Sequence, residues 1–387
     1  MRIVSMSAAS TIPWRAFTSP LEKWAVQPSF VIGEWMFILA ALFALWHAWS
    51  QPSEPGDNQR RRHLVAWVAA LVAGTANDTL FILLPLVNNF WQAQGTIMLN
   101  SRMPLYIPCV YICFMYFPTV AVWRLGLPRL GGALLSGLAG SLFYAPYDID
   151  GAKFLWWTWH DTDQPIAHRI LGAPIGSTIW VITFVAAFSW LLTSVLDRDR
   201  AVRGATAAKA LLAAAGLSSL LMVLQITVLQ QFDGGVPGIR GLVVVIAIYL
   251  AGIAWSLRRK HEAPARTIDR KLFFVVALYF VTLAAIMGVF DPVTHRSLSR
   301  HQTYGPCHVV AKDITGKTRD NYLCAEDFDE DFTFACIEKL PAPESDWYTV
   351  CSRSHRHFWR MFFGVLALAL AGISLYARLL VIRPKSS

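Results

Sequence analysis

The sequence predicts an all-α protein, a polytopic transmembrane helix bundle of about nine helices with a small disulfide-stapled extracytoplasmic loop domain. The chain of 387 residues is 55% hydrophobic and only 15% charged, with a mean hydropathy of +0.43. This composition is too apolar for an ordinary soluble domain. Apolar stretches of about 20 residues recur along the chain, which is the length a helix needs to cross the hydrocarbon layer. Regular β-alternation at barrel spacing is missing, so the spanning segments are predicted to be helices.

Nine stretches qualify as spanning helices. They cover residues 30–49, 64–90, 104–125, 131–147, 173–196, 205–230, 239–257, 272–290 and 358–382. The chain is predicted to divide into four parts. An outer tail covers 1–29, an eight-helix transmembrane bundle 30–290, an extracytoplasmic cysteine loop domain 291–357, and the last transmembrane helix with a cytoplasmic tail 358–387. Residues 1–29 contain no continuous apolar core, so we expect no cleavable signal peptide.

The distribution of Lys and Arg predicts the orientation. Of 34 such residues, 18 lie in the short loops on one side, 7 lie opposite them, and the rest lie in the long loop before the last helix. Short loops rich in Lys and Arg stay in the cytoplasm, so we expect the C-terminus inside and the N-terminus outside, in the plasma (inner) membrane. Anionic lipid is the expected partner of the net charge of +9, and no nucleic-acid module is present.

Asp78 lies inside the second apolar stretch, next to Asn77. At 1.5 Å per residue it lies roughly 20 Å from the start of that helix, about two-thirds of the way to the outer surface. An ionisable side chain at this depth costs a few kcal/mol unless it is paired or neutral, which makes it a functional candidate. The alternative is a hydrogen-bonded aspartate that holds helices together. Both interpretations place Asp78 in the interior of the bundle.

The helix over 131–147 has Gly, Ala and Ser at small-xxx-small spacing, which is typical of close helix contact. It is followed by Asp148 and Asp150, which are expected at the outer surface, at a depth similar to that of Asp78. The tryptophans over 156–159 are expected to lie as an amphipathic segment in the membrane interface. Asp150 and Lys153 would be one helical turn apart and could form an ion pair.

Three interpretations of this polar stretch remain open. His160, Asp161, Asp163 and His168 could bind a divalent ion, or they could be hydrated loop residues. Their spacing matches no strong metal signature, so we predict no metal or other cofactor. The third interpretation is acid–base chemistry, in which a carboxylic acid in a dry pocket protonates a substrate and a second group accepts a proton.

The candidate residues fall into two groups. The acid–base candidates are Asp78, Asp148, Asp150 and His160. The candidate ligand-binding residues are Asn77, Asn88, Gln92, Lys153, Asp161, Asp163, His168 and Arg169. Most acidic residues, 19 of 25, lie in the outer half of the bundle or outside it. The site is therefore expected to face outward.

Four cysteines lie in the loop domain over 291–357. They are Cys307, Cys324, Cys336 and Cys351. An even number of cysteines in one extracytoplasmic segment predicts two disulfides, with three possible connectivities that the sequence does not rank. A hairpin is predicted over 309–323, with its turn near 315–316.

Three sequence motifs and the cysteine loop are similar to those of a protein family. The stretches Lys153-Phe-Leu-Trp-Trp-Thr-Trp-His-Asp-Thr-Asp163, Asn88-Asn-Phe-Trp-Gln-Ala-Gln94 and Arg102-Met-Pro-Leu-Tyr-Ile-Pro-Cys-Val-Tyr111 resemble an uncharacterised family of multi-pass membrane proteins with animal and bacterial members, and the cysteine loop that follows His301 agrees. This resemblance implies the topology and no activity.

A second resemblance is to the membrane carotenoid hydratases. Met103-Pro-Leu105 and Asp148 followed by Trp156-Trp157 correspond to that group, whereas the cysteine loop departs from it. The resemblance implies that Asp78 or Asp148 is the acid that protonates an alkene.

Two classes of function follow, with a purely structural role as a third. One is an intramembrane enzyme that performs acid–base chemistry on an apolar lipid or isoprenoid substrate. The other is a transporter or receptor that binds a proton, a cation or a small apolar ligand at the same site. The inner loops contain no Walker-type or dinucleotide-binding pattern, which argues against nucleotide-driven work. The oligomeric state is not predicted.

Overall fold

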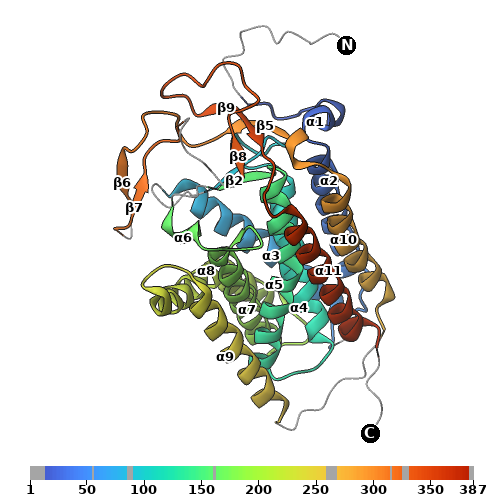
Figure 1. Ribbon diagram of the computed structural model, residues 1–387. Coiled ribbons are helices and arrows are strands. Elements are labelled where there is room, and N and C mark those ends of the chain that lie inside the picture. The colour runs from blue at the N-terminus through green and yellow to red at the C-terminus, as the bar shows by residue number, and fades with distance from the viewer. Residues whose placement is uncertain are drawn as a thin grey trace.

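The computed structural model describes residues 14–54, 56–84, 90–159, 163–258, 268–313, 316–324 and 331–382. In this part of the chain nine long helices form a bundle, with short strands gathered at one end (Figure 1). The long helices are α2 (Pro28–Trp49), α3 (Gln59–Leu83), α4 (Tyr106–Trp123), α5 (Arg129–Lys153), α7 (Ile175–Leu196), α8 (Gly204–Leu229), α9 (Ile239–Leu257), α10 (Arg270–Val289) and α11 (Phe358–Leu380). The predicted fold class is confirmed.

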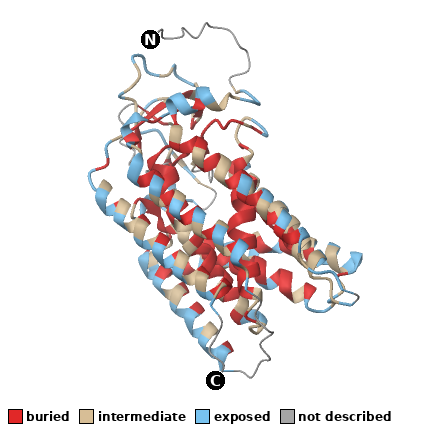
Figure 2. Ribbon diagram, turned by 90° about the vertical axis from the view of Figure 1, so that its right-hand side faces the viewer, coloured by how far each residue is buried: buried red, intermediate tan, exposed pale blue. Residues whose placement is uncertain are grey.

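Eight of these helices are long and apolar enough to cross a membrane, and α5 is the ninth long helix. The outward faces of the bundle carry exposed apolar side chains such as Leu220, Val243, Phe274 and Leu370. Figure 2 shows the buried residues concentrated in the interior of the bundle and beneath the strands. Apolar helices with exposed apolar faces of this kind are compatible with a multi-pass membrane protein.

Helix α5 lies in the interior of the bundle and packs against α4, α7, α9, α10 and α11. Its small residues permit this close approach. A Cβ atom on Gly137 would lie 2.5 Å from the carbonyl oxygen of Ile182 in α7, and one on Gly140 would lie 3.2 Å from the carbonyl oxygen of Phe114 in α4. The predicted role of the small-xxx-small spacing in close helix contact is therefore confirmed.

Helix α5 is also longer than predicted. The helix over 131–147 continues to Lys153, so Asp148 and Asp150 lie within its last turns. Pro146 lies inside the helix without ending it, and the chain leaves the helical direction at Leu155, whose φ is +56°. Both aspartates are buried in protein.

The segment after α5 folds back over the end of the bundle. Strand β2 (Trp157–Trp159) pairs antiparallel with β1 (Phe90–Gln92), and the short helix α6 (Gln164–Ala167) follows. Strands β3 (Arg169–Ile170) and β4 (Ala173–Pro174) then lead into α7. The expectation of an amphipathic tryptophan segment in the membrane interface is wrong, because Trp156, Trp157 and Trp159 are buried inside the protein.

A small domain, which we call the cap, covers this end of the bundle; we call this end the cap end and the opposite end the far end. The cap is the described part of residues 291–357. Strands β5 (Arg296–Arg300), β9 (Trp347–Ser352) and β8 (Phe332–Thr333) form an antiparallel sheet in the order β5-β9-β8. Strands β6 (Val310–Lys312) and β7 (Thr318–Asp320) form the predicted hairpin, whose turn at 314–315 lies outside the described residues.

Two disulfides staple the cap, as predicted. Cys307 pairs with Cys324, and Cys336 pairs with Cys351. The connectivity that the sequence left open therefore joins consecutive cysteines. The short helices α1 (Pro20–Val26), η1 (Gln230–Asp233) and η2 (Pro292–Thr294) complete the described elements.

Buried ion pairs attach the cap to the bundle. Lys153 at the end of α5 pairs with Asp331 of the cap, and both side chains are 0% exposed. Arg169 contributes a second contact to Asp331, at 2.9 Å between Nη1 and Oδ2. Arg319 of β7 pairs with Asp163 at 3.2 Å. The expected pair of Asp150 with Lys153 is wrong, because the Lys153 ammonium turns toward the cap.

These ion pairs lead to a first prediction. Lys153→Met removes the fully buried cation from Asp331 and leaves Arg169 as a remaining partner. A buried charge that has lost its partner costs about 3–5 kcal/mol, so the loss should stay below this range while Arg169 is present. We therefore expect a lower midpoint of thermal unfolding in detergent. Adding Arg169→Gln to Lys153→Met should lower the midpoint further, because Asp331 then loses both cations.

A matched control comes from the exposed ion pair of the cap. Arg300 pairs with Asp346, and both side chains are about 40% exposed. Such pairs contribute about 0–1 kcal/mol, so Arg300→Gln should change the midpoint little. Equal losses in Lys153→Met and Arg300→Gln would contradict the role given to the buried pair.

Three buried histidines of the cap lead to a second prediction. Burial lowers the pKa of His295 and of His355 to about 4, and that of His301 to about 3. These groups bind protons in the unfolded chain at a higher pH than in the folded one. Their contribution to stability is complete above pH 6.5 and is lost as the pH falls from about 6.5 to about 4, by about 1.4 kcal/mol per pH unit for each histidine.

Asp163 opposes this trend, because burial raises its pKa to about 7 despite its contact with Arg319. Three histidines outweigh one aspartate, so hydrogen-exchange protection of β5 and β9, corrected for intrinsic rates, should decrease from pH 6.5 to pH 4.5. His301→Gln should make the decrease shallower. A pH dependence that is the same in the variant and the wild type would refute this assignment.

Candidate functional site

A cavity of about 290 Å³ lies between α3, α4, α5, α7 and α8, with β1, β2 and α6 on its cap side. Its wall is mainly aromatic. Nine aromatic side chains contribute: Phe81, Phe90, Tyr111, Phe114, Tyr144, Tyr147, Trp157, Trp159 and Trp180. A concave, mostly apolar cavity with few polar groups is typical of small-molecule sites.

Helix α3 supplies the deepest polar groups of the wall. The Tyr111 hydroxyl donates a hydrogen bond to Oδ1 of Asp78 at 3.1 Å, whereas Oδ2 is buried with no partner among the described residues. The neighbouring Asn77 donates to the Ser219 hydroxyl at 2.8 Å, and within the same part of the chain its Oδ1 is likewise buried without a partner. Since a buried polar atom without a hydrogen bond is costly, these two acceptors indicate an additional ligand or water in the cavity.

Asp148 lies directly behind the wall. Its carboxylate accepts a hydrogen bond from Ser177, and Ser177 lines the cavity from α7. Its Oδ1 is buried without a partner. Gln92 lines the cavity from β1, where its Oε1 accepts a hydrogen bond from Tyr106 at 3.1 Å. The carboxylates of Asp78 and Asp148 therefore belong to one site, one at the surface of the cavity and the other one side chain away.

Asp150 lies elsewhere. Two residues along a helix correspond to about 200° of rotation, so it points to the side of α5 opposite Asp148. There it acts electrostatically on Tyr279 of α10, and both of its carboxylate oxygens are buried without a hydrogen bond to any described residue. The structure therefore does not bring Asp150 into the cavity.

The remaining predicted site residues divide between the cap contacts and the surface. Lys153, Asp163 and Arg169 take part in the ion pairs that hold the cap. His168 is exposed. Asn88, His160 and Asp161 lie outside the described residues. Of the twelve candidates, the cavity brings together Asn77, Asp78 and Gln92, with Asp148 behind Ser177.

The cavity reaches the side of the bundle between α3 and α8. Val223 and Thr227 of α8 line the cavity and are also exposed. The hydrogen bond from Asn77 to Ser219 joins the two helices one turn further from the cap. The opening therefore lies along α8, most of which is exposed on the outer surface of the bundle.

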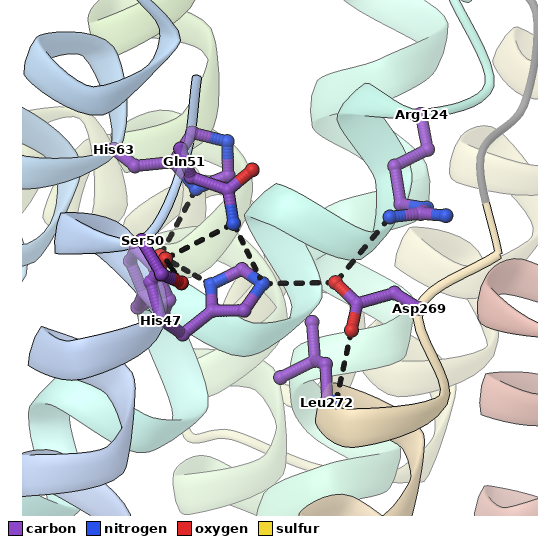
Figure 3. A network of polar contacts seen from close by, with 8 residues as sticks. His47, Ser50, Gln51, His63, Arg124, Asp269 and Leu272 are labelled. Carbon is purple, nitrogen blue, oxygen red and sulfur yellow. Dashed lines mark hydrogen bonds and ion pairs between the residues drawn. The ribbon is translucent and has the colours of Figure 1, made fainter. Parts of the chain in front are cut away.

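A second polar cluster, which we call the far-end cluster, lies at the far end (Figure 3). His47 of α2 contacts the Tyr116 hydroxyl through Nδ1 and the Asp269 carboxylate through Nε2, both at 2.8 Å. His63 of α3 contacts the same hydroxyl at 3.0 Å, and Arg124 donates to Asp269 at 3.4 Å. This cluster joins α2, α3 and α4 to the start of α10.

Sequence reasoning missed both the aromatic wall and the far-end cluster. Tyr111 with Phe114, and Tyr144 with Tyr147, are spaced three residues apart and so share a helix face, but ordinary core packing has the same pattern. His47 and Asp269 are 222 residues apart, and the sequence contains no signal that pairs them. A histidine at the end of an apolar stretch was the only available indication.

The comparisons with known proteins identify the family of this chain. A family model described as "Domain of unknown function (DUF7802)" matches residues 5–379. The chain belongs to this family. Neither the curated proteins nor the solved structures gave a match. This membership agrees with the resemblance to an uncharacterised family, whereas the resemblance to carotenoid hydratases stays a prediction.

The composition of the cavity limits its chemistry. Within the described residues no group of three or more His, Cys, Asp or Glu is arranged to hold a metal ion. Asp78 has a tyrosine as its hydrogen-bond partner and no second acid or base within hydrogen-bonding distance among the described residues. The arrangement is suited to holding a ligand by shape, aromatic contact and one or two acceptors.

The far-end cluster provides a third prediction. Asp269→Asn removes the charge that binds His47 and Arg124, and hydrogen bonds to charged groups contribute about 1.5–3 kcal/mol. We expect a loss of this size in the free energy of unfolding, measured in detergent. Glu22→Gln is the control, because Glu22 is exposed and pairs only with the exposed Arg15 in the described structure. A variant at Asp269 as stable as the variant at Glu22 would show that the cluster does not hold the helices together.

Proposed function

We propose that this protein binds a small, mainly apolar ligand in the cavity between α3, α4, α5, α7 and α8, as a receptor or a transporter. The single observation that supports the proposal is the cavity itself, which lies among the spanning helices and combines nine aromatic side chains with the Asp78 carboxylate. Buried acceptors without partners on Asn77 and Asp78 supply the polar contacts that orient a ligand.

The size of the cavity limits the ligand. About 290 Å³ lies at the lower end of the range for small-molecule sites, so a full lipid with two acyl chains does not fit. A compact ring system or a short branched chain does fit. The aromatic wall favours such a body through area burial and ring contacts.

The opening along α8 supports entry from the membrane. Val223 and Thr227 are exposed on the face of α8 that also carries exposed Leu220 and Leu224. A ligand dissolved among lipid chains would meet this opening directly. Strands β1 and β2 and helix α6 line the cavity on its cap side.

We also propose the orientation of the protein. The short loops at the far end carry most of the Lys and Arg residues, which supports a cytoplasmic location for that end. Both disulfides lie in the cap, and disulfides persist in oxidising compartments. The cap would then lie outside the plasma (inner) membrane, with the cavity opening into the outer leaflet.

Binding accounts for the geometry better than acid–base catalysis does. The catalytic hypothesis needs a second titrating group close to the substrate, but Asp150 points toward α10 and Asp148 lies behind Ser177. His160, the remaining candidate, lies outside the described residues. In this proposal, membrane lipid surrounds the helices and is the phase from which the ligand enters the cavity.

A fourth prediction tests this function. Val223→Trp places a bulky side chain in the opening, whereas Leu224→Trp places the same side chain on the neighbouring exposed position outside the cavity. With 1-adamantanol as an apolar probe of suitable size, we expect saturable binding to the wild type in lipid nanodiscs, measured by titration calorimetry. Val223→Trp should weaken binding by about tenfold, equivalent to about 1.4 kcal/mol, and Leu224→Trp should leave it unchanged.

Two outcomes would contradict the proposal. The first is a lack of saturable binding beyond that of empty nanodiscs. The second is equal binding by the two tryptophan variants, which would place the probe elsewhere on the protein.

A further inference from the structure

The charge of the cavity is the first indication of the kind of ligand it takes. Asp78 lies in its wall and Asp148 lies one side chain behind it, and no described lining residue is Lys, Arg or His. Arg102 and Arg169 act on these carboxylates electrostatically from outside the wall. Arg102 donates to the carbonyl oxygen of Ile82, and Arg169 is paired with Asp331. The described wall of the cavity therefore presents one carboxyl group, that of Asp78, and no cationic side chain, with Asp148 behind the wall.

The acceptors and the donors that have no hydrogen-bond partner among the described residues lie on different sides of the cavity. On α3, Oδ2 of Asp78 and Oδ1 of Asn77 are acceptors with no donor in the described part of the chain. On β2, the indole nitrogens of Trp157 and Trp159 are donors with no acceptor there. A ligand that satisfies these groups carries its N–H donors toward α3, and it turns any oxygen acceptor toward β2. An ammonium group has three donors and no acceptor, which matches the α3 side.

Aromatic rings surround the acidic side of the cavity. Tyr111, which holds Asp78, lies 5.9 Å from Trp180 between ring centroids. Tyr144 lies 6.0 Å from Trp180 and 5.0 Å from Phe114. The faces of such rings attract cations, and the attraction strengthens where water is excluded. A carboxylate beside an aromatic cluster is therefore a combination that recognises an organic cation.

We infer that the ligand is a small amphiphilic amine, with a compact apolar body in the aromatic cavity and its ammonium group at Asp78 and Asn77. This inference rests on the proposed function, because it names the chemical class of the ligand for the same site. Asp78 is the positioning group, since its Oδ1 is held by Tyr111 and its Oδ2 is left for the ligand. Asp148 adds negative charge from behind Ser177.

The test compares three probes with the same body in the wild-type protein in nanodiscs. They are 1-aminoadamantane and 1-adamantanol, which differ in charge and hardly in volume, and adamantane-1-carboxylate, which reverses the charge and is slightly larger. At pH 7.4 we expect the amine to bind about tenfold more tightly than the alcohol, and the carboxylate to bind most weakly, after subtraction of empty nanodiscs. An amine that binds no more tightly than the alcohol overturns the inference and leaves the proposed function standing. A lack of saturable binding by all three probes overturns both.

Two variants test whether Asp78 is the residue that makes the amine bind more tightly than the alcohol. Asp78→Asn should remove the roughly tenfold advantage of the amine over the alcohol, so that the two probes bind with similar affinity. The midpoint of thermal unfolding in detergent checks that the variant is folded. Asp150→Asn is the matched control, because Asp150 is a buried aspartate that faces away from the cavity, and the advantage should persist in it. An advantage that survives Asp78→Asn overturns the assignment of the ammonium group to Asp78.

Discussion

The buried contact between Lys153 and Asp331 is the interaction on which the arrangement of the cap end depends. Lys153 ends the central helix α5, and Asp331 belongs to the cap, so one ion pair joins two parts of the chain that are 178 residues apart. The Ser352 hydroxyl adds a hydrogen bond to the carbonyl oxygen of Lys153, at 3.0 Å. After Lys153 the described residues 154–159 and 163–174 fold back over the end of the bundle. This segment carries β2 and α6, which cover the cavity.

The cavity exists because the helices around it pack unequally. Helix α5 approaches α4 and α7 closely, since Gly137 and Gly140 leave no side chain between the backbones. Helix α8 contributes few buried residues and faces mainly outward. Large rings such as Tyr144 and Trp180 line the space between the closely packed side and α8. The result is an opening on the side of the bundle rather than at its end.

The fold could be predicted from the sequence to a large extent, because the strongest signals were local. Length and hydropathy determine a spanning helix, and the confinement of four cysteines to one loop predicts two disulfides. Asp78 stood out because a carboxyl group within an apolar stretch is costly wherever it lies. Each of these arguments needs only a short window of sequence.

The rest depended on contacts between distant segments. The periodicity of α5 separates Asp148 from Asp150, but this required knowing that the helix continues past Pro146. The tryptophans over 156–159 resembled an interfacial belt, but contacts with distant segments bury them. Trp156 packs against Phe30 of α2, Trp157 against Tyr147 of α5, and Trp159 against Phe90 of β1. The pairing of His47 with Asp269 and of Lys153 with Asp331 joins residues far apart in the chain, and a single sequence does not identify such partners.

Under the proposed route of entry beside Val223 and Thr227, occupancy of the cavity depends directly on the concentration of the ligand in the membrane and only indirectly on its concentration in water. A compound reaching the cavity through hydrocarbon is first enriched there by its oil–water partition coefficient. Apparent affinity referred to the aqueous phase is then the product of partitioning and the intrinsic contact energy. Two compounds with identical contacts to the protein would rank by their solubility in lipid, and the thickness and saturation of the host bilayer would become determinants of potency.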